Sequence, residues 1–195
     1  MKLLIGLGNP GAEYARSRHN CGFSVIDCLS RRWNVPVDRA RCRALVGEGR
    51  LNGERVILIK PQTYMNLSGD SVAEALRWYK VGPQDAMIFS DDVDLPLGAI
   101  RVRPFGGAGT HNGWRDILLK TGSDRFPRVR VGVGAKPPEW DLADWVLSRF
   151  SPADQKLMDA AFDRAADAAE RFLTHGIEEA MNLYNRKETA GKLGE

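Results

Sequence analysis

The chain has 195 residues and a net charge of +3, and this length suits one large domain that buries its own core. Its three cysteines are odd in number and match no metal-binding spacing, which predicts reduced thiols in a cytoplasmic protein. The apolar run at the N-terminus is too short for a signal peptide or a membrane span.

Strand-like and helix-like segments alternate along the chain, as expected of an α/β protein. Strands are predicted at residues 2–7, 43–51, 54–60, 86–90, 99–103 and 128–134, with Asn52-Gly53 as a hairpin turn. Helices are predicted at residues 21–33, from 68 or 70 to 79, and at 113–120, 141–147, 152–175 and 177–184. We expect a single α/β domain over residues 1–185, with a mixed twisted sheet surrounded by helices, and a flexible tail over 186–195.

The first predicted strand ends in a glycine-rich turn, Gly6-Leu7-Gly8-Asn9-Pro10-Gly11, and His19-Asn20 follows eight residues after Gly11. Ligands of open α/β sheets bind at such strand ends. The turn formally matches the dinucleotide-binding pattern G-x-G-x-x-G. However, Pro10 and the polar stretch after it oppose a helix that starts at the second glycine. We therefore disfavour a nucleotide cofactor.

His19 is a candidate general base. It precedes Asn20, a good N-cap residue for the helix at 21–33. The field at a helix start is expected to lower the pKa of His19, which keeps the imidazole neutral and able to accept a proton near pH 7. A lone histidine is more often a structural hydrogen-bonding group, so position alone leaves both interpretations open.

Three acidic residues, Asp91, Asp92 and Asp94, follow the strand at 86–90. They could bind a divalent metal, but Leu95-Pro96 cuts short a calcium-type loop and no second acidic cluster is evident. One carboxylate that orients His19 is the better functional interpretation, and acids in a surface turn are the alternative.

Two further turns carry amides, Tyr64-Met65-Asn66 and His111-Asn112-Gly113. Asparagine offers a donor and an acceptor without charge, which suits binding a carbonyl and a water molecule. These asparagines could also be ordinary turn residues. We interpret His111 and His175 as structural.

Residues 1–60 hold eleven Lys and Arg against five Asp and Glu. Such an Arg-rich face suggests a polyanion partner such as RNA, although a solvated helix face and hairpin would explain the same charges. The chain has no G-x-S-x-G, H-E-x-x-H or Walker motif. For a hydrolase, water activated directly by a histidine base is then the simplest mechanism.

Four motifs in register resemble the bacterial peptidyl-tRNA hydrolase family. They are Gly6-Leu7-Gly8-Asn9-Pro10-Gly11 with Tyr14 and Arg18-His19-Asn20, then Tyr64-Met65-Asn66-Leu67-Ser68-Gly69, Asp91-Asp92-Val93-Asp94-Leu95-Pro96, and Gly106-Gly107 with His111-Asn112-Gly113. The resemblance runs from residue 1 to about 185. It implies hydrolysis of the ester between a stalled nascent peptide and tRNA, so that both are released for reuse.

The resemblance also implies roles for individual residues. His19 would take a proton from water, Asp91 would fix its tautomer, and Asn9 would distinguish a blocked peptidyl group from a free amine. The residues implied to line the peptide and tRNA 3′-end site, or to clamp an acceptor-stem phosphate, are Tyr14, Tyr64, Asn66, Asn112, Arg103 and Arg130. No metal or cofactor is implied. The expected protein is a cytoplasmic monomer that binds peptidyl-tRNA and no membrane.

The chain departs from the family pattern at several positions. Ser90 stands where the best-known member has His, Arg103 where it has Lys, and Ala108 and Thr110 where it has His and Gly. Thr110 is expected to restrict the glycine-rich loop. The competing function is a non-catalytic RNA-binding protein of the same fold, but the presence of the four residues Asn9, His19, Asp91 and Asn112 favours the enzyme.

Overall fold

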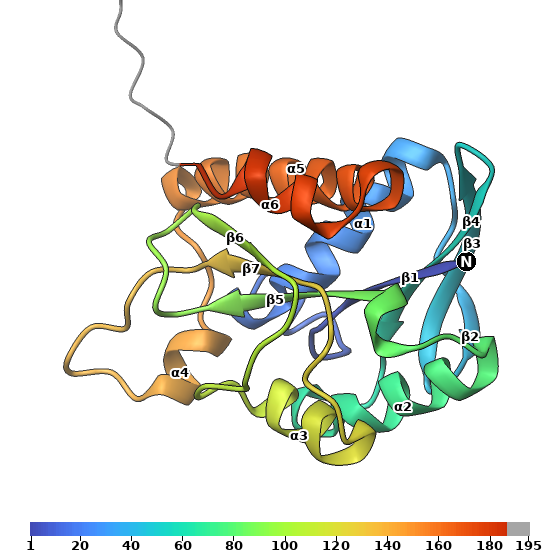
Figure 1. Ribbon diagram of the computed structural model, residues 1–195. Helices are drawn as coiled ribbons and strands as arrows, with labels where there is room; N and C mark the ends of the chain where they lie inside the picture. Colours follow the sequence, from blue (N-terminus) through green and yellow to red (C-terminus); the bar gives the residue numbers. More distant parts are fainter. Residues whose placement is uncertain (187–195) are drawn as a thin grey trace, which may run out of the picture.

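The computed structural model describes residues 1–186, so the predicted tail lies outside it apart from its first residue. Within this range the chain forms one mixed sheet in the order β2-β3-β4-β1-β5-β7-β6 (Figure 1). The strands are β1 (Lys2–Gly6), β2 (Arg39–Arg41), β3 (Ala44–Leu51), β4 (Glu54–Pro61), β5 (Ala86–Asp92), β6 (Ile100–Arg103) and β7 (Arg128–Gly132). The four central strands are parallel, and β2, β3 and β6 pair in antiparallel fashion at the edges.

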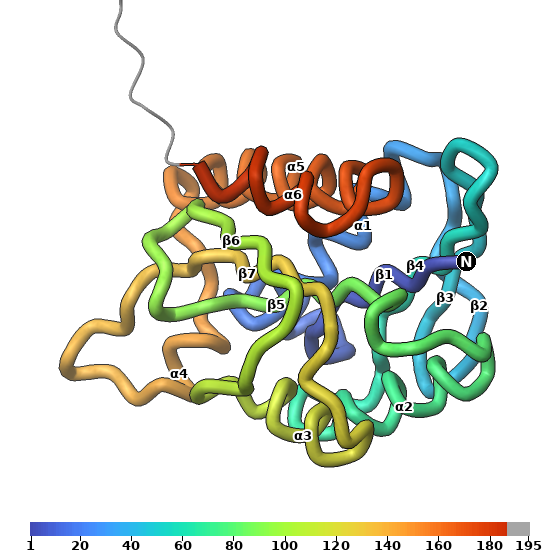
Figure 2. The backbone as a smooth tube through the Cα atoms, viewed as in Figure 1, coloured from blue at the N-terminus to red at the C-terminus, as the bar shows by residue number. Residues whose placement is uncertain are grey.

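Helices cover both faces of this sheet (Figure 1). They are α1 (Cys21–Trp33), α2 (Ser68–Tyr79), α3 (Asn112–Thr121), α4 (Leu142–Leu147), α5 (Pro152–His175) and α6 (Ile177–Tyr184). Successive side chains of β1 point to opposite faces. Leu4 therefore packs in the core under α1 and α5, while Leu3 and Ile5 pack in the core over α2 and α3. Figure 2 shows α4 at the end of the molecule away from the β3–β4 hairpin.

The predicted α/β class and the single mixed sheet are confirmed, and the predicted element ends agree with the observed ones to within two residues. The Asn52-Gly53 turn has positive φ at both residues (49° and 83°), as a type I′ hairpin requires. Strand β2 was missed because its three residues are all exposed and show no apolar alternation. Only pairing with β3 makes it a strand.

Two glycines bring α1 into direct contact with β1. A Cβ on Gly22 would lie 2.3 Å from Leu7 N and 2.5 Å from Phe89 O, and a Cβ on Gly6 would lie 2.1 Å from Gly22 O. No side chain fits in those spaces, so the start of α1 rests on the ends of β1 and β5. This contact places the residues just before α1 beside the end of β5.

None of the helices in residues 1–186 is long and apolar enough to cross a membrane. Cys21, Cys28 and Cys42 are all free and buried, which agrees with the predicted reduced thiols. The Arg-rich region is partly neutralised, since Arg32 pairs with Asp163 and Asp167, and Arg43 pairs with Asp70 and Glu74.

Candidate active site

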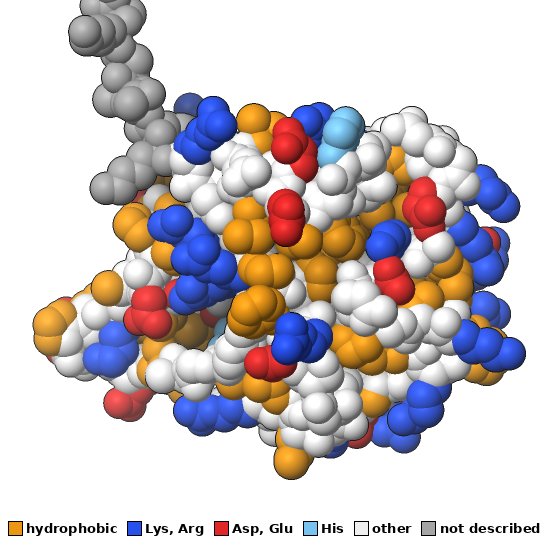
Figure 3. Space-filling model, in the orientation of Figure 1, with side chains coloured by type: hydrophobic (Ala, Val, Ile, Leu, Met, Phe, Trp, Pro, Cys, Tyr) orange, Lys and Arg blue, Asp and Glu red, His pale blue; other side chains and the backbone are white. Residues whose placement is uncertain are grey.

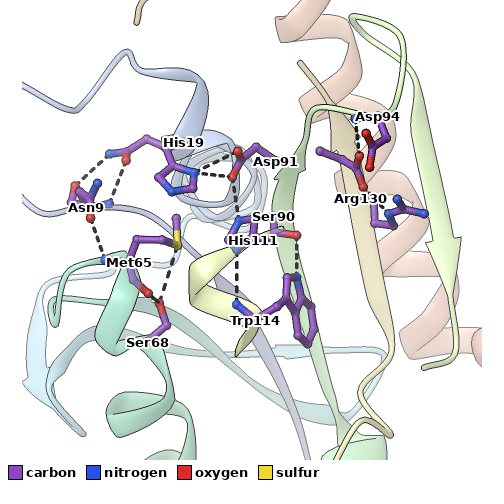
Figure 4. Close-up of polar contacts among 12 residues, drawn as sticks. Asn9, His19, Met65, Ser68, Ser90, Asp91, Asp94, His111, Trp114 and Arg130 are labelled. Carbon is purple, nitrogen blue, oxygen red and sulfur yellow. Dashed lines mark hydrogen bonds and ion pairs between the residues drawn. The ribbon is translucent and has the colours of Figure 1, made fainter. Parts of the chain in front are cut away.

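His19 and Asp91 meet where α1 begins and β5 ends (Figure 4). His19 lies in a 3₁₀ turn, Arg18–Asn20, directly before α1. Its Nδ1 is 2.9 and 3.0 Å from the two carboxylate oxygens of Asp91. An ionised carboxylate only accepts hydrogen bonds, so Nδ1 carries the proton and donates it. The tautomer that follows leaves Nε2 of neutral His19 without a proton.

His111 binds the same carboxylate from the other side. Its Nε2 lies 3.0 Å from Asp91 Oδ1, and its ring centroid is 5.1 Å from that of His19. His111 is also the N-cap of α3, where Nδ1 accepts from Trp114 N at 3.3 Å. Nε2 therefore carries the proton of neutral His111. The predicted structural role of His111 is incomplete, because the residue also contacts Asp91 and lines the cavity described below.

Asp91 is buried and remains ionised between the two rings. Burial alone would raise the pKa of Asp91, but the charges of His19 and His111 and their hydrogen bonds outweigh it and hold the pKa well below its usual range. Burial alone would likewise lower the pKa of His19, but Asp91 raises it above 6.5. The expected lowering of the His19 pKa by the helix field is therefore wrong, because the carboxylate contact dominates.

Asn20 does not cap α1 with its side chain, contrary to the prediction. Its Oδ1 instead accepts from Asn9 N at 2.9 Å, and its Nδ2 donates to Asn9 O at 3.0 Å. Asn9 Oδ1 in turn accepts from Met65 N at 2.7 Å. The two bonds from Asn20 hold the Asn9 backbone, whereas the bond from Met65 N joins the loops after β1 and β4 and fixes the orientation of the Asn9 side-chain amide. Within residues 1–186, Asn9 Nδ2 makes no hydrogen bond and is left to donate.

A cavity of about 740 Å³ opens beside His19 and Asp91. Its walls are the glycine-rich loop at 106–110, the start of α3 and the α4 residues Leu142, Ala143 and Val146. Figure 3 shows it as a hollow with Lys and Arg side chains on one rim and hydrophobic side chains on the other. Of the predicted binding residues, Asn112, Arg103 and Arg130 line this cavity.

The other predicted binding residues lie outside this cavity. Tyr64 and Asn66 are exposed on the loop after β4, next to Met65 and therefore on the Asn9 side of His19. In Figure 4, Asn9 and Asp91 lie on opposite sides of the His19 ring. Tyr14 is half-buried in the loop between β1 and α1. His19 thus separates an amide-rich region from the larger cavity.

Four arginines share one face of the β6–β7 pair. Arg101 lies opposite Arg130 and Arg103 opposite Arg128, and residues two apart in a strand point the same way. Like charges placed opposite one another destabilise a sheet, so this arrangement needs compensation or a ligand. Asp92 compensates one of them, because it forms an ion pair with Arg130 Nε.

Arg128 was missed by sequence reasoning. Its guanidinium is buried, lies 3.6 Å from the ring centroid of Trp114, and donates to the carbonyl oxygens of Gly106 and Gly107. Burial and the nearby Arg130 lower the pKa of Arg128 to about 10. Trp114 Nε1 donates to Ser90 Oγ at 2.9 Å. The glycine-rich loop is therefore tied to the residue beside Asp91.

Arg18 anchors α4 to the turn that carries His19. It is buried against the ring of Trp145, with its Cζ 3.7 Å from the centroid, and donates to Ser148 Oγ and Arg149 O at 2.7 Å. One wall of the cavity is thus attached to the residue that precedes the candidate base. Residues 16–20 are all polar, and this stretch gave no sign that Arg18 is buried.

Of the three acids, only Asp91 contacts His19. Asp92 binds Arg130 and accepts from Asp94 N at 2.8 Å. Within the described residues, His19, Asp91 and His111 form a group that could hold a metal ion, because their potential ligand atoms lie within 4.8 Å of one another. Two imidazoles and a carboxylate are ligands that zinc accepts, but the same atoms already hydrogen-bond to one another.

Comparisons with known proteins agree with the family that the sequence motifs resemble. The family described as peptidyl-tRNA hydrolase matches residues 3–192. The chain is 47% identical to a peptidyl-tRNA hydrolase of Lachnospira eligens, over 95% of this chain and 100% of that protein. It is also 47% identical to one of Symbiobacterium thermophilum, over 94% and 98%. The crystal structure of peptidyl-tRNA hydrolase from Acinetobacter baumannii is similar, with a TM-score of 0.90 and 35% identity over 95% of this chain and 94% of that one.

Proposed function

Since the chain belongs to the peptidyl-tRNA hydrolase family and hydrolyses the ester that joins a peptide to tRNA, we propose that His19 is the base that activates the attacking water. The observation that carries this proposal is the contact of His19 Nδ1 with buried Asp91. That contact directs the unprotonated Nε2 away from the carboxylate, where it can accept a proton.

The reaction then needs two proton transfers, one from water to His19 and one from His19 to the leaving ribose oxygen. Water gives a proton to His19 Nε2 while its oxygen attacks the ester carbonyl, and Asp91 stabilises the imidazolium that forms. When the tetrahedral intermediate collapses, the bond to the ribose oxygen breaks and that oxygen takes the proton back from Nε2. Asn112 supports the developing oxyanion. Its Oδ1 accepts from Arg115 at 3.3 Å, which leaves Nδ2 to donate.

Asn9 explains how a peptidyl group would be distinguished from a free amino acid. Because Met65 N occupies Asn9 Oδ1, the amide presents Nδ2 as a donor. An acylated amine offers a carbonyl oxygen that accepts this hydrogen bond, whereas a free ammonium offers only further donors. The selectivity thus depends on the Asn9 backbone position that Asn20 holds and on the amide orientation that Met65 N fixes.

The cavity next to His19 suits the tRNA, while the amide-rich side at Asn9, Tyr64 and Asn66 suits the peptide. Arg103 is exposed, and the terminal nitrogens of Arg130 remain available beside its ion pair with Asp92, so both can contact an acceptor-stem phosphate. One chain supplies all of these groups, which supports action as a monomer. The free, buried cysteines support a reducing compartment, the cytoplasm.

A turnover assay tests the proposal against a non-catalytic RNA-binding role. Purified protein is given N-acetyl-aminoacyl-tRNA and free aminoacyl-tRNA, each with and without EDTA. We expect turnover of the blocked substrate alone, at a rate that EDTA leaves unchanged. Asn9→Ala should narrow the preference for the blocked substrate. Binding without turnover would support the RNA-binding role, and loss of activity in EDTA that zinc restores would assign His19, Asp91 and His111 to a metal.

A further inference from the structure

Phe105 is an exposed aromatic ring in the wall of the cavity. It is 52% exposed and lies two residues beyond β6, directly before the glycine-rich loop. The indole of Trp114, which lines the same cavity, is buried. The Arg128 guanidinium lies over its ring, and its Nε1 donates to Ser90 Oγ. Apart from the partly buried imidazoles of His19 and His111 at the Asp91 carboxylate, Phe105 is therefore the aromatic ring that a ligand can reach among the described residues that line the cavity.

The backbone that follows Phe105 is held in place. Gly106 N donates to Asp124 O at 3.1 Å, and buried Arg128 binds the carbonyls of Gly106 and Gly107. The guanidinium of Arg125 lies 5.4 Å from the centroid of the Phe105 ring and is itself largely exposed. The ring is thus a preorganised surface, with a cation on one side and the cavity beside it.

The charges of the cavity indicate what would contact this ring. Asp91 is hydrogen-bonded to two histidines, Asp92 pairs with Arg130, and exposed Asp94 is the one carboxylate of the lining that forms no ion pair within residues 1–186. Arg103, Arg115 and Arg128 line the same cavity, and within residues 1–186 none of them forms an ion pair with a carboxylate. A positively charged groove with an exposed aromatic ring is how proteins bind single-stranded nucleic acid, because phosphates follow the charges and bases stack on the ring.

We propose that Phe105 is a stacking platform for a base of the single-stranded 3′ end of tRNA, with Arg125 holding the ring from behind. This inference rests on the proposed function, since it requires the ester-bearing end of tRNA to enter the cavity beside His19. Phe105 would then set affinity for the 3′ end without taking part in the chemistry. An apolar side chain of the peptide is the competing occupant, and the arginines of the cavity argue against it.

Direct binding of short oligonucleotides tests the platform. The probe is the trinucleotide CCA with a fluorescent label at its 5′ end, compared with three versions that each lack one base but keep the sugar and phosphate. For the wild-type protein, removal of the stacked base should raise Kd by about 5- to 150-fold, the range that stacking on an aromatic residue supplies. For Phe105→Leu, which keeps an apolar side chain without a π face, the same removal should change Kd less than about twofold.

Two variants serve as controls. Phe105→Trp should restore the sensitivity to base removal. Trp78→Leu should leave it as in wild type, because Trp78 is an equally exposed aromatic residue with an arginine, Arg41, 5.0 Å from its ring centroid, but does not line the cavity. The far-UV spectrum and Tm of each variant should match wild type, since the ring is largely exposed.

In the turnover assay Phe105→Leu should show a raised KM and a kcat within about threefold of wild type, whereas Phe105→Trp and Trp78→Leu should keep a KM close to that of wild type. The proposal is overturned if removal of a base weakens the affinity of Phe105→Leu as much as that of the wild type at all three positions. It is also overturned if the variant binds every oligonucleotide normally but changes KM according to the amino acid in the substrate, which would assign the ring to the peptide. Wild-type protein that binds CCA but hydrolyses no ester would contradict the proposed function instead.

Discussion

The carboxylate of Asp91 contacts Nδ1 of His19 through both of its oxygens, at 2.9 and 3.0 Å, and the carboxylate is almost fully buried while the imidazole keeps a small exposed edge. This contact fixes the tautomer of His19 and raises the pKa of its ring. It therefore has two opposing effects on activity, because it improves the base while it extends protonation of that base to higher pH.

Asp91→Asn should separate these effects. The rate requires neutral His19, so kcat of the wild type should fall as pH drops through a His19 pKa above 6.5. Without the carboxylate this rising limb should move to lower pH, while kcat at pH 8 falls by about 100-fold or more and KM changes little. The measurement is kcat from pH 5 to 8.5.

Asp94→Asn is the matched control for Asp91→Asn, because Asp94 lines the same cavity but is exposed and does not contact His19. Its pH profile should follow that of the wild type. A normal kcat and an unshifted profile for Asp91→Asn would return Asp91 to the role of an acid in a turn.

Arg128→Met should disturb the glycine-rich loop. The change keeps an apolar stem against Trp114 but leaves the carbonyls of Gly106 and Gly107 without their donor. We expect the free energy of unfolding to fall by about 1–3 kcal/mol and KM for tRNA substrates to rise more than kcat falls. Urea unfolding and steady-state kinetics provide the two readouts.

Arg128→Lys keeps the charge but cannot bind both carbonyls with a planar fork, so it should recover stability only in part. Arg77→Met, at an exposed position of α2, controls for the loss of an arginine. If Arg128→Met destabilises the protein but leaves KM unchanged, the loop does not contribute to tRNA binding.

Arg103 and Arg130 should carry part of the salt dependence of tRNA binding. A phosphate contact releases counterions, so Arg103→Ala should raise KM and reduce the log–log salt slope by roughly 0.7–0.9, while saturated kcat stays within a few-fold. Arg130→Ala should weaken binding further, because it also exposes the charge of Asp92. Adding Asp92→Asn to Arg130→Ala should remove that extra loss.

Arg39→Ala tests the alternative surface for tRNA, since Arg39 is exposed on β2 within the Arg-rich region. Its slope should equal that of the wild type. A reduced slope for Arg39→Ala together with normal slopes for Arg103→Ala and Arg130→Ala would move the tRNA to that region. The losses should also fade on a 3′-end fragment that lacks the acceptor stem.

Local patterns were sufficient to predict most elements of the fold. Asn52-Gly53 has the backbone freedom that a type I′ turn demands, and Ser151-Pro152 marks the start of α5 with a side-chain cap. In both cases neighbouring residues decide the structure. Strand β2 depends on a partner strand, so its own sequence carries no signal.

Site residues that belong to a sequence motif could be predicted. Site residues whose role depends on contacts with distant parts of the chain could not. His19, Asp91 and Asn9 stand in motifs, but Asn20 looked like a helix cap and instead binds Asn9 across the loop. His111 and Arg128 act through residues about twenty positions away in the chain. Such pairings arise only when the sheet brings β5, β7 and the glycine-rich loop together.

The most direct measurement of the central claim is the single-turnover rate of His19→Ala with saturating N-acetyl-aminoacyl-tRNA. Exposed His175, which bonds to Thr174, provides the control variant His175→Ala. We expect His19→Ala to keep the wild-type fold and tRNA affinity and to lose about 100-fold or more in rate, while His175→Ala retains the full rate. A folded His19→Ala protein that cleaves the ester at close to the wild-type rate would contradict the assignment of His19 as the base.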